Sequence, residues 1–425
     1  MPTRSFSTIQ HLGDRIQLLI RLITAEWVAA GGEEQPFESP AWTTLTDQLQ
    51  DATEELVAEV ISPKSYFRNL QLSHYDLVAF QVALEFRLFN HVPLSGEITL
   101  KELAQKVGVD QDRVGRVMRL LNVHGVFEET REDVFMHSVI SEFIAKDDSA
   151  QSAIAIQMDE MYQAASSTAE AIRKSPLEQK SDITPFSTRF GTSIYEFYTK
   201  NSDKADRFGR AMRGASGLDE ESMISLRECY DWAAMGSGKI VDVGGGAGHV
   251  SKLLSQHFPN LSFAVQDIFP PPSLGPDNKI AENVQFHQHD FFQPQPVTDA
   301  EAYFMKHALH NHSDADCIKI IRALVPALEK AGKGTPLLLN EGIIPALGHK
   351  TPRHQDLAIR RGDMCMMVTL SARERTAKQF GQLLKAADPR LNVTKIHGGA
   401  VTKLIEVHLA NAEEAPANGI APIDV

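Results

Sequence analysis

The second half of the chain alternates short apolar runs with amphipathic segments of helical length. Apolar runs bounded by glycine or polar residues predict buried strands, and three- to four-residue apolar spacing predicts helices. Strands are predicted at Ile240–Val243, Leu261–Val265, Val284–His287, Ala302–Lys306, Leu337–Asn340, Val393–Ile396 and Lys403–Leu409, and helices at His249–Phe258, Asp316–Leu328 and Thr376–Ala387. Repeated strand–helix units predict an α/β fold with a mostly parallel sheet covered on both faces. Such a sheet binds its ligands beyond the carboxyl ends of its strands.

The first half of the chain has helical spacing almost throughout. Helices are predicted at Ile9–Val28, Leu45–Val60, Tyr75–Phe89, Thr99–Val107, Asp110–Leu121 and Ala153–Ile172, and a hairpin at Val126–Glu128 and Val134–Met136. The short helix opens with a capping box formed by Thr99 and Glu102. Helix, turn, helix and hairpin in this order are typical of a winged-helix domain.

These patterns divide the chain into five segments. We expect N-terminal helices at 1–66, a winged-helix domain at 67–148, a helical connector at 149–235, the sheet domain at 236–411 and a disordered tail at 412–425. The tail is polar and proline-bearing, which is typical of disorder. The first two helices have no sheet of their own, so another domain or a second subunit has to cover their apolar faces.

A glycine-rich turn follows the first predicted strand of the sheet. The dinucleotide fingerprint G-x-G-x-x-G fails here, because its third glycine falls on His249. The spacing of Asp242, Gly244, Gly246 and Gly248 instead resembles the S-adenosylmethionine (SAM) motif of class I methyltransferases. The turn therefore predicts a nucleotide-like ligand, and its spacing favours SAM.

Two acidic residues follow the next two predicted strands. Asp267 lies about 20 residues beyond the glycines, where a carboxylate can bind ribose hydroxyls. Asp290 follows the third strand and could accept a hydrogen bond from an adenine amino group. The alternative is that both acids only cap loops, but their joint position behind the glycine turn favours a cofactor site.

Composition narrows the class of protein. The chain has 425 residues, of which 43% are hydrophobic, and a net charge of −13. It contains no apolar run of about 18 residues, so we expect no membrane span, and its N-terminus does not resemble a secretory signal. Three cysteines far apart in the sequence disfavour disulfides and predict a reducing, cytoplasmic compartment.

The winged-helix pattern leaves DNA binding as an alternative function. Arg113, Arg116 and Arg119 lie on one face of its second helix, as in a DNA-binding regulator. Against this, the predicted wing is acidic and the chain as a whole would repel phosphates. We therefore expect no nucleic-acid partner and interpret these arginines as members of surface ion pairs.

Three histidines lie just past the strand that ends at Lys306. His307, His310 and His312 could form a metal site, could be packing residues, or could include a general base that removes a proton from a hydroxyl. No cysteine supports a metal site, and we expect none. A base needs an orienting carboxylate, and Glu341 and Glu374 both fall on the same rim of the sheet. Spacing alone does not choose among the histidines.

The connector is rich in aromatic and methionine side chains. Met158, Met161 and Tyr162, with Met364 later in the chain, could be ordinary core or the wall of a pocket for a flat, apolar substrate.

The chain resembles the SAM-dependent O-methyltransferases of the plant caffeic-acid and flavonoid type, and especially their fungal secondary-metabolism relatives. The motifs that carry the resemblance are VDVGGGAG, FHQHDFFQPQPV, AYFMKHALHNHSDADCIKIIRALVPAL, NEGIIP, RRGDMCMM, ARERT, ADPRLNV and LIEV. The similarity implies a class I SAM-methyltransferase fold with a Rossmann-like sheet and an N-terminal winged-helix domain that mediates dimerisation. It also implies a homodimer and a small aromatic or polyketide-type substrate.

The resemblance assigns roles to single residues. His310 matches the catalytic base, and Glu341 and Glu374 match the acids beside it. The cofactor residues by this resemblance are Gly244, Gly246 and Gly248 at the methionine end, Asp267 at the ribose, Asp290 and Phe291 at the adenine, and Lys306 nearby.

The chain departs from the family pattern at two places. Asn311 and His312 stand where the family often has Asp-Trp, and Ser371 stands where it often has Asn. Some relatives keep SAM bound but catalyse pericyclic or dehydration steps, so a non-methylating enzyme is a second alternative.

Overall fold

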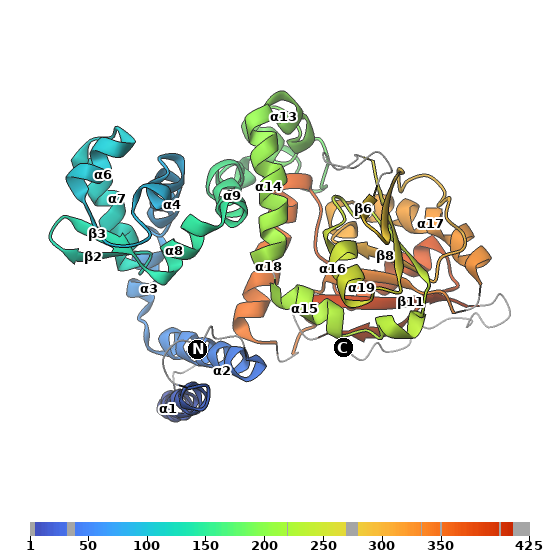
Figure 1. The fold of residues 1–425 in the computed structure, drawn as a ribbon, viewed down its shortest axis with the longest axis horizontal. Coiled ribbons are helices and arrows are strands. Elements are labelled where there is room, and N and C mark those ends of the chain that lie inside the picture. Colours follow the sequence, from blue (N-terminus) through green and yellow to red (C-terminus); the bar gives the residue numbers. More distant parts are fainter. Residues whose placement is uncertain are drawn as a thin grey trace.

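The computed structural model describes residues 5–31, 39–218, 220–268, 279–332, 334–348, 351–398 and 401–410. Figure 1 shows a winged-helix lobe at one end, a sheet domain at the other, and a bundle of helices between them. Within the described ranges, no helix is both long and apolar enough to cross a lipid bilayer. The tail predicted at 412–425 lies outside the described residues.

The sheet domain is built on eight strands in the order β10-β11-β9-β8-β4-β5-β7-β6. The strands are β4 (Lys239–Val243), β5 (Ser262–Asp267), β6 (Lys279–Ala281), β7 (Val284–Gln288), β8 (Ala302–Lys306), β9 (Leu337–Gly342), β10 (Leu391–His397) and β11 (Thr402–Leu409). Strands β9, β8, β4, β5 and β7 run parallel, and the others pair antiparallel at the two edges. The mostly parallel sheet is thus confirmed, whereas the short edge strand β6 was not predicted.

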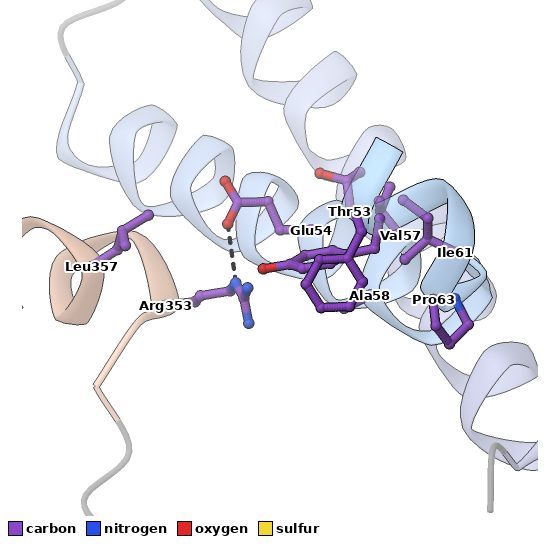
Figure 2. Close-up of a pocket in the computed structure, with 10 residues that line it drawn as sticks. Thr53, Glu54, Val57, Ala58, Ile61, Pro63, Arg353 and Leu357 are labelled. Carbon is purple, nitrogen blue, oxygen red and sulfur yellow. Dashed lines mark hydrogen bonds and ion pairs between the residues drawn. The ribbon is translucent and has the colours of Figure 1, made fainter. Parts of the chain in front are cut away.

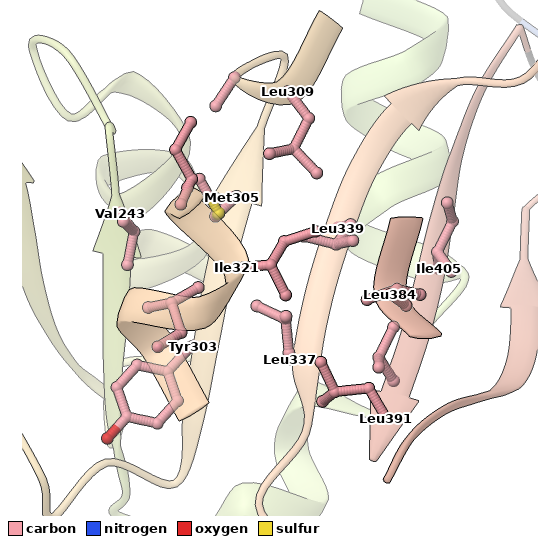
Figure 3. Close-up of a cluster of buried hydrophobic side chains, with 14 of the residues drawn as sticks. Val243, Tyr303, Met305, Leu309, Ile321, Leu337, Leu339, Leu384, Leu391 and Ile405 are labelled. Carbon is pink, nitrogen blue, oxygen red and sulfur yellow. The ribbon is translucent and has the colours of Figure 1, made fainter. Parts of the chain in front are cut away.

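Helices cover both faces of the sheet because successive strand residues point to opposite sides. The covering helices are α15 (Glu220–Glu228), α16 (His249–His257), α17 (Asp314–Ala331) and α19 (Ala377–Ala387). Tyr303 and Met305 of β8 belong to the cluster that includes α17 and α19, whereas Phe304 between them packs with Trp232 on the other face. Figure 3 shows the first cluster, with side chains of β8 and β9 meeting those of the two helices.

The winged-helix domain has the predicted order of elements. It consists of α4 (His74–Glu85), α5 (Leu88–His91), β1 (Ile98–Thr99), α6 (Leu100–Val107), α7 (Gln111–Val123), β2 (Phe127–Arg131), β3 (Val134–His137) and α8 (Val139–Lys146), with the sheet order β1-β3-β2. The capping box is confirmed, since Thr99 and Glu102 each accept the other's backbone N–H. The helix predicted to reach Phe89 is wrong in its extent, because Arg87 adopts a left-handed conformation (φ 53°) that separates α4 from α5.

Two of the three arginines of α7 form ion pairs within the protein. Arg119 forms ion pairs with Glu129 and Asp133 of the hairpin, and Arg116 pairs with Asp112 at 2.7 Å. These contacts agree with the interpretation of Arg116 and Arg119 as surface ion-pair residues, and for Arg113 it stays a prediction.

The single helix predicted at Ala153–Ile172 is wrong. The segment forms α9 (Asp148–Ile156), a π-helical turn η1 (Gln157–Met161), α10 (Tyr162–Ala165) and α11 (Thr168–Lys174). The π-turn directs Asp159 and Glu160 towards Lys204 and Arg207, which pair with both carboxylates. The break between α10 and α11 lies at Ser166. The hydroxyl of Ser166 donates to the carbonyl of Gln163 and competes with helical hydrogen bonding there.

The remaining helices connect the two lobes. They are α12 (Pro185–Phe190), α13 (Ile194–Lys200), α14 (Ser202–Leu218), the 3-10 turn η2 (Trp232–Met235) and α18 (Arg353–Leu370). Helix α18 was not predicted. Few of its residues are buried, and its apolar positions give little helical periodicity.

Two N-terminal helices form a hairpin that docks on the start of α18. Helices α1 (Phe6–Ala29) and α2 (Pro40–Val60) pack together, and α3 (Pro63–Leu70) leads to the winged-helix domain. The carboxylate of Asp51 accepts the backbone N–H groups of Arg353 and His354 at 2.9 and 3.1 Å, and so caps α18. Figure 2 shows an apolar groove between α2, α3 and α18, with the Glu54–Arg353 ion pair at its side.

Candidate active site

The glycine turn has the open backbone that a cofactor needs. Gly244, Gly246 and Gly248 all have positive φ, at 73°, 57° and 72°, a region that favours glycine. A Cβ on Gly246 would meet no atom within 4 Å, so the turn leaves open space over this residue. A Cβ on Gly244 would lie 3.2 Å from the Phe291 ring, which therefore closes directly over the turn. The turn and Phe291 thus fit a ligand that lies against bare backbone.

The predicted acids lie at the carboxyl ends of neighbouring parallel strands. Asp267 ends β5, and its carboxylate accepts the N–H of Gly246 at 3.0 Å. Asp290 follows β7 and accepts the N–H of Phe292 at 2.9 Å. The structure therefore brings Asp267 to the glycine turn, where its carboxylate binds the backbone of the loop, and its role at a ribose stays a prediction.

Asp242 lies beneath the turn and supports it. It is 2% exposed, and its carboxylate accepts the hydroxyl of Ser251 at 2.6 Å. Burial raises the pKa of Asp242 to about 6, against the effect of the Ser251 hydrogen bond. A Cβ on Gly245 would lie only 2.6 Å from this carboxylate, so Gly245 is needed for the close approach. The pattern of glycines and acids in the sequence did not predict roles for Gly245 and Ser251.

The histidine turn follows β8 at the same edge of the sheet. We use this name for residues 307–312, which include the 3-10 turn η3 (Leu309–Asn311). Nδ1 of His310 lies 2.7 Å from Oε1 of Glu374. Glu374 lies a few residues before α19 begins. A carboxylate only accepts, so Nδ1 carries the hydrogen and Nε2 is left as a proton acceptor. His310 and Glu374 have the geometry of a base and its orienting acid.

Glu341 has a different position from Glu374. It is fully buried at the end of β9, and its Oε1 accepts the backbone N–H groups of Ala308 and Leu309 at 3.1 and 2.8 Å. Burial raises the pKa of Glu341, opposed by the positive field of His310. Glu341 therefore holds the backbone of the histidine turn, while Glu374 holds the imidazole ring.

The protonation of His310 is set by opposing influences. Burial disfavours the imidazolium, but the Glu374 hydrogen bond and the nearby Glu341 and Glu374 charges outweigh it and raise the pKa of His310. One ring nitrogen of His310 and one carboxylate oxygen each of Glu341 and Glu374 all lie within 4.8 Å of one another. This arrangement can take a proton from a hydroxyl and stabilise the resulting positive charge.

The other two histidines, His307 and His312, pack against neighbouring rings. The ring of His307 stacks on that of His310 with centroids 5.1 Å apart, and burial holds the pKa of His307 well below its ordinary value. His312 meets the rings of Phe291 and Phe292 edge-on at 5.5 Å. Among the residues that the structure describes, neither ring has the carboxylate partner at Nδ1 that distinguishes His310.

The departures from the family pattern have local roles. The side-chain amide of Asn311 donates to the carbonyl of His307 at 3.0 Å, a bond that an ionised aspartate cannot make. Ser371 ends α18 in a left-handed conformation.

The predicted substrate wall divides into buried and exposed parts. Met158 and Tyr162 are half-buried, whereas Met161 packs in a hydrophobic cluster with Phe186 and residues of α13. Met364 is half exposed on α18, which contacts both η1 and η3. Helix α18 thus contacts both η1, which carries Met158 and Met161, and η3 of the histidine turn, and the part played by each side chain in a substrate wall stays a prediction.

Comparisons with known proteins agree with this geometry. Residues 168–388 match an O-methyltransferase domain, and residues 69–147 match an O-methyltransferase dimerisation domain. The O-methyltransferase sol2 of Alternaria solani is 37% identical over 382 residues, which cover 89% of this chain and 88% of sol2.

The chain belongs to the O-methyltransferase family. The enzyme therefore uses SAM, and the predicted class I methyltransferase fold is confirmed. A chlorophenol O-methyltransferase of Trichoderma longibrachiatum is 29% identical and aligns with 81% of this chain and 77% of its own length.

Solved structures share the fold of the enzyme at low sequence identity. OxaC in complex with SAH and oxaline superposes with a TM-score of 0.73 at 20% identity, over 94% of this chain and 100% of OxaC. A protein described as a pericyclic reaction enzyme superposes with a TM-score of 0.71 at 18% identity, over 94% and 99% of the two chains. The fold alone therefore does not distinguish methylation from other reactions.

Proposed function

We propose that the enzyme methylates a phenol or enol hydroxyl of a small aromatic or polyketide-type metabolite, with His310 as the general base. The observation that carries this proposal is the hydrogen bond of 2.7 Å between Nδ1 of His310 and Glu374. It leaves Nε2 as the proton acceptor at the edge of the sheet where the glycine turn lies. The substrate hydroxyl would bind between these two features.

The proton transfer follows from the tautomer of His310. Nε2 accepts the hydroxyl proton, and the resulting imidazolium is stabilised by the negative field of Glu374 and Glu341. Bound SAM supplies an electrophilic methyl group to the substrate oxygen, and S-adenosylhomocysteine is the second product. Fixing the hydroxyl next to both the base and the methyl group can contribute roughly 7–11 kcal/mol to lowering the barrier.

The cofactor would lie along the carboxyl edge of β4, β5 and β7. Gly244, Gly246 and Gly248 would admit its methionine end, and Asp267 would bind the ribose hydroxyls. The ring of Phe291, which closes over Gly244, would contact the adenine, together with Asp290. Lys306 ends β8 between this edge and the histidine turn and would contribute positive charge there.

The substrate class rests on the predicted apolar wall. Met158, Tyr162 and Met364 would offer flat and adaptable apolar surface, and helix α18, which carries Met364, contacts η3 of the histidine turn. The chlorophenol O-methyltransferase among its relatives supports a phenolic acceptor. An aromatic secondary metabolite satisfies both observations.

The enzyme would act as a homodimer through residues 67–148. Val123, Val139 and Ile140 of the winged-helix domain are more than half exposed, and an interface with a second subunit would remove their apolar surface from water. The match of residues 69–147 to a dimerisation domain supports the same surface.

The test of the base is His310→Gln. We expect turnover to fall by about 10²- to 10⁴-fold while SAM still binds with unchanged affinity by calorimetry. His397→Gln is a matched control, because His397 also pairs with a glutamate at 2.7 Å but lies on β10 at the sheet edge. Full turnover in the His310 variant would exclude it as the base.

A further inference from the structure

Arg375 holds the backbone of the histidine turn. Its side chain is 1% exposed, and Nη1 donates to the carbonyl of Leu309 at 3.0 Å while Nη2 donates to the carbonyl of His312 at 2.8 Å. These two carbonyls flank His310 in the sequence. A single guanidinium therefore fixes the main chain on both sides of the base.

The positive charge of Arg375 is neutralised by the partly exposed carboxylate of Asp314. Asp314, the first residue of α17, accepts from Nε and Nη2 at 3.0 and 2.9 Å through one carboxylate oxygen. Burying an arginine is costly unless it is paired and its donors are used, and here three nitrogens have partners. Placing a buried charge here is consistent with a requirement for fixed geometry around His310.

The backbone of Arg375 is attached to the strand that carries Glu341. Its carbonyl accepts the N–H of Ile344 at 3.0 Å, and Arg375 forms a parallel bridge with Ile343 just beyond β9. Glu341 reaches the N–H groups of the histidine turn from this strand, and Arg375 reaches its carbonyls. The histidine turn is thus held by a carboxylate that accepts its N–H groups and by a guanidinium that donates to its carbonyls.

We propose that Arg375 is a positioning residue for the base, an inference that rests on the proposed role of His310. Glu374 and Arg375 are adjacent in the chain: the first holds the imidazole ring and the second holds the backbone that carries it. Movement of the turn would lengthen the bond from His310 to Glu374, and thereby lower the pKa of His310 and reduce proton transfer.

The substitution Arg375→Lys tests this role, because lysine keeps the charge but lacks the planar fork that reaches two carbonyls and a carboxylate. We expect kcat to fall by about 10-fold or more with KM for SAM unchanged, and the acid limb of the kcat/KM profile to move to lower pH. Arg373→Lys is the matched control. Arg373 pairs with the same Asp314, is 41% exposed, and forms no hydrogen bond with the histidine turn in the described structure.

A readout without turnover separates this inference from the proposed function. The Nδ1–H proton of His310 can be followed by NMR and assigned by its loss in His310→Gln. We expect its resonance to shift or broaden in Arg375→Lys and to stay in place in Arg373→Lys. If Arg375→Lys does not fold, Asp314→Asn, which keeps the acceptor oxygen but removes the charge, is expected to shift the same resonance. An unchanged resonance and pH profile in a folded variant would overturn the role of Arg375, whatever reaction the enzyme catalyses.

Discussion

The position of His310 is set by one contact to its ring and by further contacts to the backbone of neighbouring residues. Glu374 binds the ring at Nδ1, Glu341 binds the backbone N–H groups before it, and Arg375 binds the carbonyls on either side. This division explains why two glutamates occur at the site. Only Glu374 determines the tautomer, whereas Glu341 determines where the turn lies.

The pH dependence of turnover follows from the raised pKa of His310. The base is active when neutral, so kcat/KM rises as the pH increases through this pKa. Glu374→Gln removes one negative charge and replaces the charged acceptor of the Nδ1–H with a neutral amide oxygen, while burial still disfavours the imidazolium. We therefore expect the acid limb to move to lower pH and kcat to fall on the order of 10²-fold.

The control for this prediction is Glu406→Gln. Glu406 also accepts hydrogen bonds from histidines, His397 and His408, but lies on β11. Its variant should keep the wild-type profile. An acid limb that stays in place, or moves to higher pH, in Glu374→Gln would show that Glu374 does not set the pKa of His310.

At the scale of elements, α18 links the N-terminal hairpin to the active site. Its first turn is capped by Asp51 of α2, and farther along the helix Asp363 accepts the backbone N–H of Glu374 at 2.9 Å. The N-cap residue itself, Pro352, forms no side-chain cap hydrogen bond. The cap therefore comes from another part of the chain, which a sequence pattern does not reveal.

Loss of this cap should lower stability. Asp51→Ala removes the acceptor for two N–H groups, and we expect a loss of about 0.5–2 kcal/mol in the free energy of unfolding. Urea unfolding followed by the fluorescence of Trp27 and Trp42, whose rings are 5.8 Å apart on α1 and α2, measures this loss of stability.

The contribution of Asp51 to stability depends on pH. Burial raises the pKa of Asp51, but hydrogen bonds from His354 and Arg353 outweigh burial and lower the pKa from its ordinary value of 3.8. The contribution is therefore present above this value and is lost as the pH falls through the folded-state pKa. Equal stability of variant and wild type at neutral pH would contradict the capping role.

Other elements could be predicted only in part, for a similar reason. The parallel strands are buried apolar runs, and the glycine turn has a distinctive spacing, so both are visible in the sequence. The π-turn at Gln157–Met161 depends on ion pairs with α14, and Arg375 becomes important only through contacts with a turn more than 60 residues earlier. His310 was distinguished from its two neighbouring histidines by family resemblance, because spacing does not show which ring meets a carboxylate.

At the scale of the whole molecule, the exposed apolar side chains of the winged-helix domain predict the oligomeric state. We expect light scattering on the purified enzyme to give twice the mass of the chain. Val139 is 85% exposed, and Val139→Lys should shift the equilibrium towards monomer without unfolding. A wild-type enzyme that remains a monomer at high concentration would contradict the dimer.

We expect the substrate oxygen to receive a methyl group from SAM. The most direct measurement is mass spectrometry of reactions containing SAM with a deuterated methyl group and a panel of phenols and enols. We predict a product that has gained one deuterated methyl group, formed in equal amount with S-adenosylhomocysteine and at least about 10²-fold more slowly with His310→Gln. A product whose mass shows rearrangement or loss of water, formed while SAM is not consumed, would contradict methyl transfer by this enzyme.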